Sequence, residues 1–569
     1  MPVSTGTGWR RSSPTHYPDA VPLDTLITGR IATLSGDDGF GWVEAIGIRD
    51  GRVAFAGSEV YLETRADPFT ERIALEPDEV AIPGLTDAHL HLARVAAATR
   101  QIDLTDAATL AEGLERIRAA HVALGDPTAW LEGHGWDVDR WDRWPTADDL
   151  EPVAPGRRCA LWAHDHHALL ASRPALDASG VTRDTADPAG GVIRRTAEGE
   201  PEGVLLESAT RLVASRIPAM EQADLEAALI AVSQELLSLG IVEVHDPAGL
   251  APDPDLDWSY PAYARLSETG RLPLRVMASL RDDALDTALA GGLHSGAVLG
   301  HDPHGRARIG WMKCFADGSL GSRTAALLVD IEPEPDRPLP PDRRRGVWNT
   351  EPERLTELVE RAALGGISTQ IHAIGDAAVR AALDALEGTA SRVPFMPKIE
   401  HVQLLDEADR GRFAAPGIVA SVQPVHLGSD AAQARKLWGD RAERNGYTWG
   451  TLAATGAVLA FGTDSPVEPF DPWPGIALAV RREDPRWPAG TPEFGPDESL
   501  SLDRALRAAC VGPALSTREN DRGRLVVGHR ADVVVIPAAC IDDAVEPGGA
   551  LSTARPSIVV LDGRVVYET

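Results

Sequence analysis

Two histidines separated by a single residue are the first candidates for chemistry in this chain. They lie in residues 81–92, which read Ala-Ile-Pro-Gly-Leu-Thr-Asp-Ala-His-Leu-His-Leu. If residues 87–91 are extended, the imidazoles of His89 and His91 point to the same side, because strand side chains alternate. Two such imidazoles can share one metal ion. An ordinary pair of histidines at a strand end is the alternative, so the pair needs support from the rest of the chain.

Further residues suited to metal binding or proton transfer follow along the chain: Lys313, His372, His401 and Asp464. Imidazoles and a carboxylate suit a divalent ion such as zinc, which leaves a position for a water that the ion acidifies. Asp464 follows the apolar residues 457–461, and it could bind the ion or pass the water's proton to the leaving group.

Lys313 lies among apolar residues in the sequence Trp-Met-Lys-Cys-Phe. A lysine in such surroundings is costly unless it is paired or modified. A carbamate formed with CO₂ would turn it into a bridging ligand. A snorkelling or salt-bridged lysine is the simpler interpretation of this residue.

The elements that carry these groups are short apolar runs. From residue 240 onward the runs alternate with amphipathic helices, which is typical of parallel β/α units. They cover residues 241–244, 274–277, 309–315, 367–371, 418–422 and 458–461. Most of them end at a polar or ionisable residue. In a β/α barrel such residues lie at the carboxyl ends of the strands, where active sites are built.

The two ends of the chain are rich in strand signals instead. Residues 45–57 predict a hairpin that turns at Asp50-Gly51, and residues 558–567 predict one that turns at Asp562-Gly563. We therefore expect one small β-sandwich assembled from both termini. Residues 100–240 contain helix signals and two histidine-rich clusters.

Composition limits the function classes. The chain has 569 residues, 43% of them hydrophobic, and a net charge of −30 without a basic run, which argues against nucleic acid and anionic membranes as partners. Residues 1–20 lack the apolar core of a signal peptide and predict a disordered or docking tail. Four scattered cysteines favour a reducing cytoplasm. We expect a cytoplasmic protein with a small-molecule substrate, and a barrel of this size is compatible with a homo-oligomer.

The ordered set of motifs resembles the amidohydrolase superfamily, and within it the YtcJ-like branch of the amidohydrolase-3 type. The residues that carry the resemblance are 83–91, 187–193, 203–205, 244–246, 313–325, 371–376, 399–401, 423–424, 462–467 and 528–535. The resemblance implies a distorted (β/α)₈ TIM barrel formed by residues 83–515, with an inserted α+β subdomain at about 100–240. It also implies a composite β-sandwich domain formed by residues 21–82 and 516–569.

The resemblance further implies hydrolysis of an amide-like C–N bond by a metal-activated water. His89 and His91 would be ligands from the first barrel strand, and His372 and His401 ligands from later strands. Asp464 would be both a ligand and the proton shuttle. Lys313 matches a strand lysine that, when carboxylated, holds a second ion. One or two ions therefore fit, with zinc as the default and iron or manganese as alternatives.

Four residues are candidates for substrate contacts. His134 and Trp136 lie in a family-like His-Gly-Trp segment that would form a pocket wall, with a packed loop as the alternative. His167 matches the imidazole of an insertion motif whose neighbours depart from the family pattern. Arg323 ends a glycine- and serine-rich loop that could bind a substrate carbonyl or carboxylate, or could simply support Lys313.

The substrate would carry an amide, N-substituted formamide, carbamate or cyclic amide bond. Two other functions fit the same residues. An esterase or lactonase would use the same metal site, and a catalytically silent metal-binding scaffold would keep the ligands without turnover.

Overall fold

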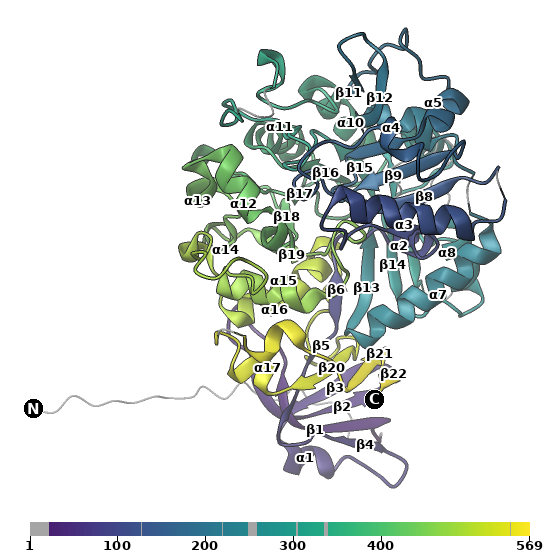
Figure 1. Ribbon diagram of the computed structural model, residues 1–569. Helices are drawn as coiled ribbons and strands as arrows, with labels where there is room; N and C mark the ends of the chain where they lie inside the picture. Colours follow the sequence, from purple (N-terminus) through teal and green to yellow (C-terminus); the bar gives the residue numbers. More distant parts are fainter. Residues whose placement is uncertain are drawn as a thin grey trace, which may run out of the picture.

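The computed structural model describes residues 22–126, 128–218, 220–247, 259–302, 305–334, 339–546 and 548–569. The tail predicted for residues 1–20 lies outside this part of the chain. The described residues form three sheets surrounded by helices (Figure 1). Within these ranges, every helix is too short or too polar to cross a bilayer.

Eight parallel strands form a nearly closed barrel. In pairing order they are β6 (Leu85–Asp87), β13 (Ile241–Asp246), β14 (Arg275–Arg281), β15 (Ala307–Phe315), β16 (Thr369–Ala373), β17 (Lys398–His401), β18 (Val419–Val422) and β19 (Val458–Phe461). The first and last strands approach each other where the Ala88 N–H donates to the Phe461 carbonyl at 2.8 Å. Every apolar run expected to be a strand overlaps one of these, so the predicted α/β barrel is confirmed.

Helices connect the strands and cover the outside of the barrel (Figure 1). They include α2 (Leu92–Ala98), α7 (Gln222–Ser238), α8 (Tyr260–Glu268), α10 (Pro352–Leu364), α11 (Asp376–Glu387), α12 (His426–Trp438), α15 (Pro472–Arg481) and α16 (Leu502–Ser516). In α10 the buried apolar residues recur three and four apart, as an amphipathic helix requires: Leu355, Leu358, Val359 and Ala362. In β16, Ile371 packs into the core beneath the helices. Its neighbour His372 therefore faces the barrel interior.

Strands from both ends of the chain pair in one sheet below the barrel, where the purple and yellow segments meet in Figure 1. Its order is β22 (Arg564–Glu568), β21 (Ile558–Leu561), β20 (Val533–Pro537), β5 (Glu79–Pro83), β1 (Thr25–Ala32), β2 (Trp42–Arg49) and β3 (Arg52–Gly57), and β4 (Glu71–Ala74) also pairs with β1. Both predicted hairpins are present. The strands expected to form a composite β-sandwich pair into one continuous sheet, joined where β5 runs antiparallel to β20.

The third sheet has six strands and is inserted between β6 and β13. Its order is β11 (Gly191–Arg195), β12 (Pro201–Glu207), β10 (Ala168–Ala171), β9 (Cys159–Ala163), β8 (Leu131–Trp136) and β7 (Ile102–Asp103), with helix α3 (Leu110–Ala123) beside it. Helix α7 lies within the range expected for the insertion, but its residues Leu225 and Leu229 belong to the barrel core.

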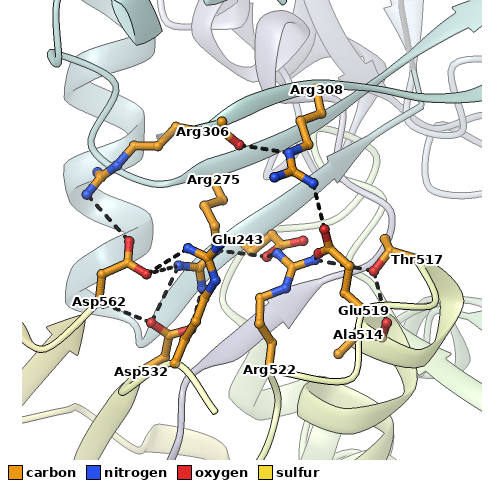
Figure 2. A network of polar contacts seen from close by, with 12 residues as sticks. Glu243, Arg275, Arg306, Arg308, Ala514, Thr517, Glu519, Arg522, Asp532 and Asp562 are labelled. Carbon is orange, nitrogen blue, oxygen red and sulfur yellow. Dashed lines mark hydrogen bonds and ion pairs between the residues drawn. The ribbon is translucent and has the colours of Figure 1, made fainter. Parts of the chain in front are cut away.

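A buried ion network ties the C-terminal segment to the base of the barrel (Figure 2). Arg275, the first residue of β14, lies 3.0 Å from Glu243 and 3.1 Å from Asp562, and it also contacts Asp532. Arg522 reaches the same Glu243 carboxylate from the segment after α16. Removal of one partner would leave a buried charge uncompensated, which typically costs about 3–5 kcal/mol. The network lies at the amino ends of the strands, opposite the rim.

Candidate metal centre

The two histidines of the opening motif converge on one carboxylate. Strand β6 ends at Asp87, and His91 lies at the N-terminus of α2. The backbone is therefore not extended as far as His91, in contrast to the expectation for residues 87–91. The imidazoles nevertheless meet, because His89 Nε2 lies 3.2 Å and His91 Nε2 lies 3.4 Å from Asp464 Oδ1. Burial lowers the pKa of His91 to about 4, which leaves its imidazole neutral, as a metal ligand must be.

Asp464 reaches this position from the loop after β19. Its φ of 62° is in the left-handed region, which is uncommon for a residue other than glycine. Its backbone N–H donates to the His89 carbonyl at 2.7 Å, so the two segments are fixed to each other. Burial opposes the negative charge, but the contacts with His89, His91 and His426 outweigh it and hold the pKa of Asp464 well below its usual range. The carboxylate is therefore ionised.

His372 and His401 stand beside this group at the ends of β16 and β17. Their ring centroids are 4.4 Å apart, and the ring of His401 lies 5.1 Å from that of His89. Burial, together with neighbouring positive charges, holds the pKa of both imidazoles well below the usual value. His372 Nε2 lies 3.1 Å from the Gly318 carbonyl and therefore carries the proton. The four predicted histidine ligands and the predicted ligand Asp464 are thus brought together at the rim.

Lys313 projects from β15 toward the same point. Its Nζ lies 3.5 Å from His89 Nε2 and 4.8 Å above the ring of Phe315. The side chain is buried, and burial lowers its pKa to about 8. The simpler interpretation of a snorkelling lysine does not fit this placement, because its amine ends inside the barrel beside a candidate ligand.

A seventh group at the site, His426, was not predicted from the sequence. It is the first residue of α12, and its Nε2 lies 3.3 Å from Asp464 Oδ2. The strand β18 ends at Val422, and the first polar residue after it is Gln423. The sequence Gln-Pro-Val-His could have predicted this placement. If a helix begins directly after Gln423, the side chain three residues later lies at the same rim of the barrel.

These donors form two overlapping groups that could each hold an ion. One consists of His89, His91 and Asp464, and the other of His401, His426 and Asp464; within each, the donor atoms lie within 4.8 Å of one another. His401 Nδ1 and His426 Nε2 are buried and make no hydrogen bond within the described residues. Imidazoles, one carboxylate and buried donor atoms without a hydrogen bond fit a zinc-like divalent cation.

A cavity of about 310 Å³ leads to the metal centre. Its walls come from the barrel rim and from the inserted subdomain: Trp136, Trp144, His167, Leu320, His372, His401, His426 and Asp464. Trp136 is held by a hydrogen bond of 2.8 Å from its indole N–H to the Leu161 carbonyl. This volume suits a small molecule.

Among the predicted substrate contacts, His167 and Trp136 line the cavity. His167 Nδ1 lies 2.8 Å from Glu207 Oε2, and its ring centroid is 5.0 Å from that of His372. Burial disfavours a charged imidazole, but the Glu207 carboxylate outweighs burial and raises the pKa of His167 to about 9. His167 is therefore protonated at neutral pH.

The other two predicted contacts are engaged elsewhere. The His134 ring lies against that of His166, with centroids 6.3 Å apart. The Arg323 guanidinium is buried between two carboxylates, with Nε 3.0 Å from Glu334 and Nη2 2.9 Å from Asp139. Neither side chain is part of the cavity wall among the described residues.

Comparisons with known proteins agree with this geometry. The model of the amidohydrolase family matches residues 78–567. The chain is 30% identical over 529 residues to YtcJ of Bacillus subtilis (strain 168), a protein named as an amidohydrolase, covering 92% of this chain and 96% of that protein. It is 27% identical over 539 residues to the N-substituted formamide deformylase of Arthrobacter pascens, covering 92% and 95%.

A solved structure shares the whole architecture. An uncharacterised metal-dependent hydrolase from Pyrococcus horikoshii superimposes with a TM-score of 0.70 at 25% identity, covering 92% of this chain and 98% of that one. The resemblance first read from the ordered motifs is confirmed. The chain belongs to the amidohydrolase family of metal-dependent hydrolases.

Proposed function

We propose that the protein hydrolyses a non-peptide carbon–nitrogen bond of a small molecule by means of a metal-activated water. One observation carries the proposal: the donor atoms of His89, His91 and Asp464 converge on one point, and Asp464 lines the cavity. An ionised carboxylate beside two imidazoles is the arrangement that both binds a divalent ion and accepts a proton.

The ion would be held by His89, His91 and Asp464, with His372 and His401 beside them. When bound, a divalent ion lowers the pKa of water and polarises a carbonyl oxygen. We propose zinc from the donor set. The number of ions is two if Lys313 is carboxylated, since a carbamate at its Nζ would add oxygen donors next to His89.

The chain's own residues supply the proton transfers. Asp464 accepts the proton of the attacking water and delivers it to the departing nitrogen. The protonated His167 donates a hydrogen bond to an oxygen of the substrate, and Glu207 keeps the imidazole in that form. Trp136 forms an apolar wall that excludes water from the reacting bond.

The substrate class that we propose is an N-substituted amide or formamide, a carbamate or a cyclic amide. Similarity over most of the chain to an enzyme named N-substituted formamide deformylase supports this class. The cavity volume of about 310 Å³ favours a compact substrate.

The test uses purified protein loaded with zinc and a panel of matched pairs, each an N-substituted formamide and the corresponding formate ester, together with carbamates and lactams. We expect hydrolysis of at least one C–N substrate, lost on chelation and restored by zinc. Hydrolysis of esters alone would overturn the proposal in favour of an esterase or lactonase. Zinc binding without turnover of any compound would favour a silent scaffold.

A further inference from the structure

A line of buried polar side chains crosses the barrel interior from its base to the metal centre. It begins at Glu243, which the base network pairs with Arg275 and Arg522 (Figure 2). Glu243 Oε1 lies 3.3 Å from His245 Nε2, on the same strand β13. These two residues are two positions apart and face the same side, as strand geometry requires.

Two residues of β17 continue the line across the barrel. Lys398 Nζ lies 3.0 Å from His245 Nδ1 and 4.0 Å from Glu400 Oε1. Glu400 Oε2 lies 2.7 Å from His89 Nδ1. Both side chains are fully buried, so the line joins the base network to a candidate metal ligand without an exposed member.

Lys398 also fixes the backbone next to the ligand. Its ammonium donates to the Ala88 carbonyl at 2.9 Å, and it lies 4.1 Å above the ring of Trp311. The peptide that Lys398 holds is therefore the one immediately before His89.

Charges inside a barrel need an explanation. The interior of such a barrel is ordinarily filled by branched apolar side chains, and a buried ion pair is often no more stabilising than apolar residues of the same volume. Glu400 and Lys398 were not assigned a role from their motif. Their position suggests that they serve the metal centre rather than stability alone.

We propose that Glu400 is a positioning residue for His89. Its carboxylate holds Nδ1, so that Nε2 faces Asp464, and Lys398 holds both that carboxylate and the peptide of residue 88 in place. The inference rests on the proposed role of His89 as a ligand, but not on any substrate. Carboxylates that orient a metal-binding histidine typically contribute 10–100-fold in metal affinity.

The competing explanation is that Glu400 only neutralises the buried charge of Lys398. The two explanations predict different Zn²⁺ affinities for variants in which the buried charges stay balanced. Glu400→Asp keeps the charge but shortens the side chain by one methylene, which withdraws the carboxylate from His89 Nδ1. The double variant E400Q/K398M removes both charges together and leaves no unpaired ion behind.

The experiment measures the affinity of the metal-stripped full chain for Zn²⁺ by competition with a chromogenic chelator, and records the absorption spectrum after loading with Co²⁺. We expect E400Q, E400D and E400Q/K398M each to bind Zn²⁺ about 10–100-fold more weakly than the wild type. The Co²⁺ spectrum should shift in all three, since the orientation of one ligand changes.

Wild-type Zn²⁺ affinity in both E400D and E400Q/K398M would overturn the positioning role, because both variants keep the buried charge balanced. A matched control is Asp562→Asn, which removes a carboxylate of the base network that does not touch Glu243 or the line above it. We expect this variant to lower the thermal midpoint of the apo protein and to leave Zn²⁺ affinity unchanged.

The outcome is separable from that of the proposed reaction. A wild-type chain that binds Zn²⁺ tightly but cleaves no C–N bond would remove the proposed reaction and leave the positioning role testable. A wild-type chain that binds neither Zn²⁺ nor Co²⁺ would overturn both.

Discussion

Replacing Asp464 by Asn removes the charge and the basicity of the side chain while keeping its shape. In the structure, Oδ1 lies 3.2 Å from His89 Nε2 and 3.4 Å from His91 Nε2, and Oδ2 lies 3.3 Å from His426 Nε2. An amide oxygen can keep one side of this arrangement, but an amide cannot accept the proton of the attacking water. General acid–base groups contribute about 10²–10⁴-fold, which corresponds to about 3–5.5 kcal/mol in the activation barrier.

The expected result is therefore a fall in kcat of about 10²–10⁴-fold with little change in KM. The assay follows turnover of the best C–N substrate at saturating zinc, with the metal content of each sample measured by mass spectrometry. Asp484→Asn is the matched control, since Asp484 is a buried aspartate that pairs with Arg486 away from the cavity. A zinc-loaded D464N protein that keeps wild-type turnover would refute the proton-shuttle role.

Three further changes test other parts of the site. His426→Gln removes the imidazole that lies 3.3 Å from Asp464 Oδ2, so kcat at saturating zinc should fall about 10–100-fold, as is typical when a group that orients a metal-site carboxylate is lost; an unchanged kcat would exclude His426 from the site. Lys313→Met should lower the metal content from two ions to one if a carbamate bridges them, and intact-mass measurement of the wild type should show the added CO₂; one ion in both proteins would exclude the bridge. His164 is half-buried beside Glu468, and this carboxylate outweighs the effect of burial and raises the pKa of His164 to about 9. This folded-state pKa lies above the unfolded value of about 6.5, so the pair stabilises the fold fully below pH 6.5 and loses that effect as the pH rises to 9. His164→Gln should therefore be less stable than the wild type at pH 6, by on the order of 2 kcal/mol, and should approach it at pH 9; equal unfolding free energies at pH 6 would contradict this.

The barrel and most of its rim could be predicted because both follow from local patterns. Apolar runs alternate with amphipathic helices, and parallel strands bring their carboxyl ends to one edge. His372 and Asp464 each follow such a run, so their meeting at the rim is a consequence of topology. The left-handed turn that aims Asp464 at His89 has no comparable local signal.

Other placements depend on partners that are distant in sequence. The sequence around Arg323 is compatible with substrate binding. In the fold its guanidinium is paired with Asp139 of the inserted subdomain and with Glu334 of a later loop, and neither pairing has a local sequence signal. Helix α7 carries the same kind of helix signal as α3, but only packing against the barrel separates it from the insertion. His426 was missed because only the first polar residue after each predicted strand was considered, and after β18 that residue is Gln423.

The join between the two chain ends has a consequence for synthesis on the ribosome. Strand β5 (Glu79–Pro83) directly precedes β6 and the candidate metal-binding histidines, yet its partner β20 (Val533–Pro537) is made only after all the barrel strands. Likewise, Arg275 pairs with Asp532 and Glu243 pairs with Arg522, and both partners are made after the barrel strands. A nascent chain that has not reached residue 522 lacks both of these partners, so Arg275 and Glu243 have only each other at the base of the barrel. The sheet and the ion network below the barrel are therefore completed only after every barrel strand has been made.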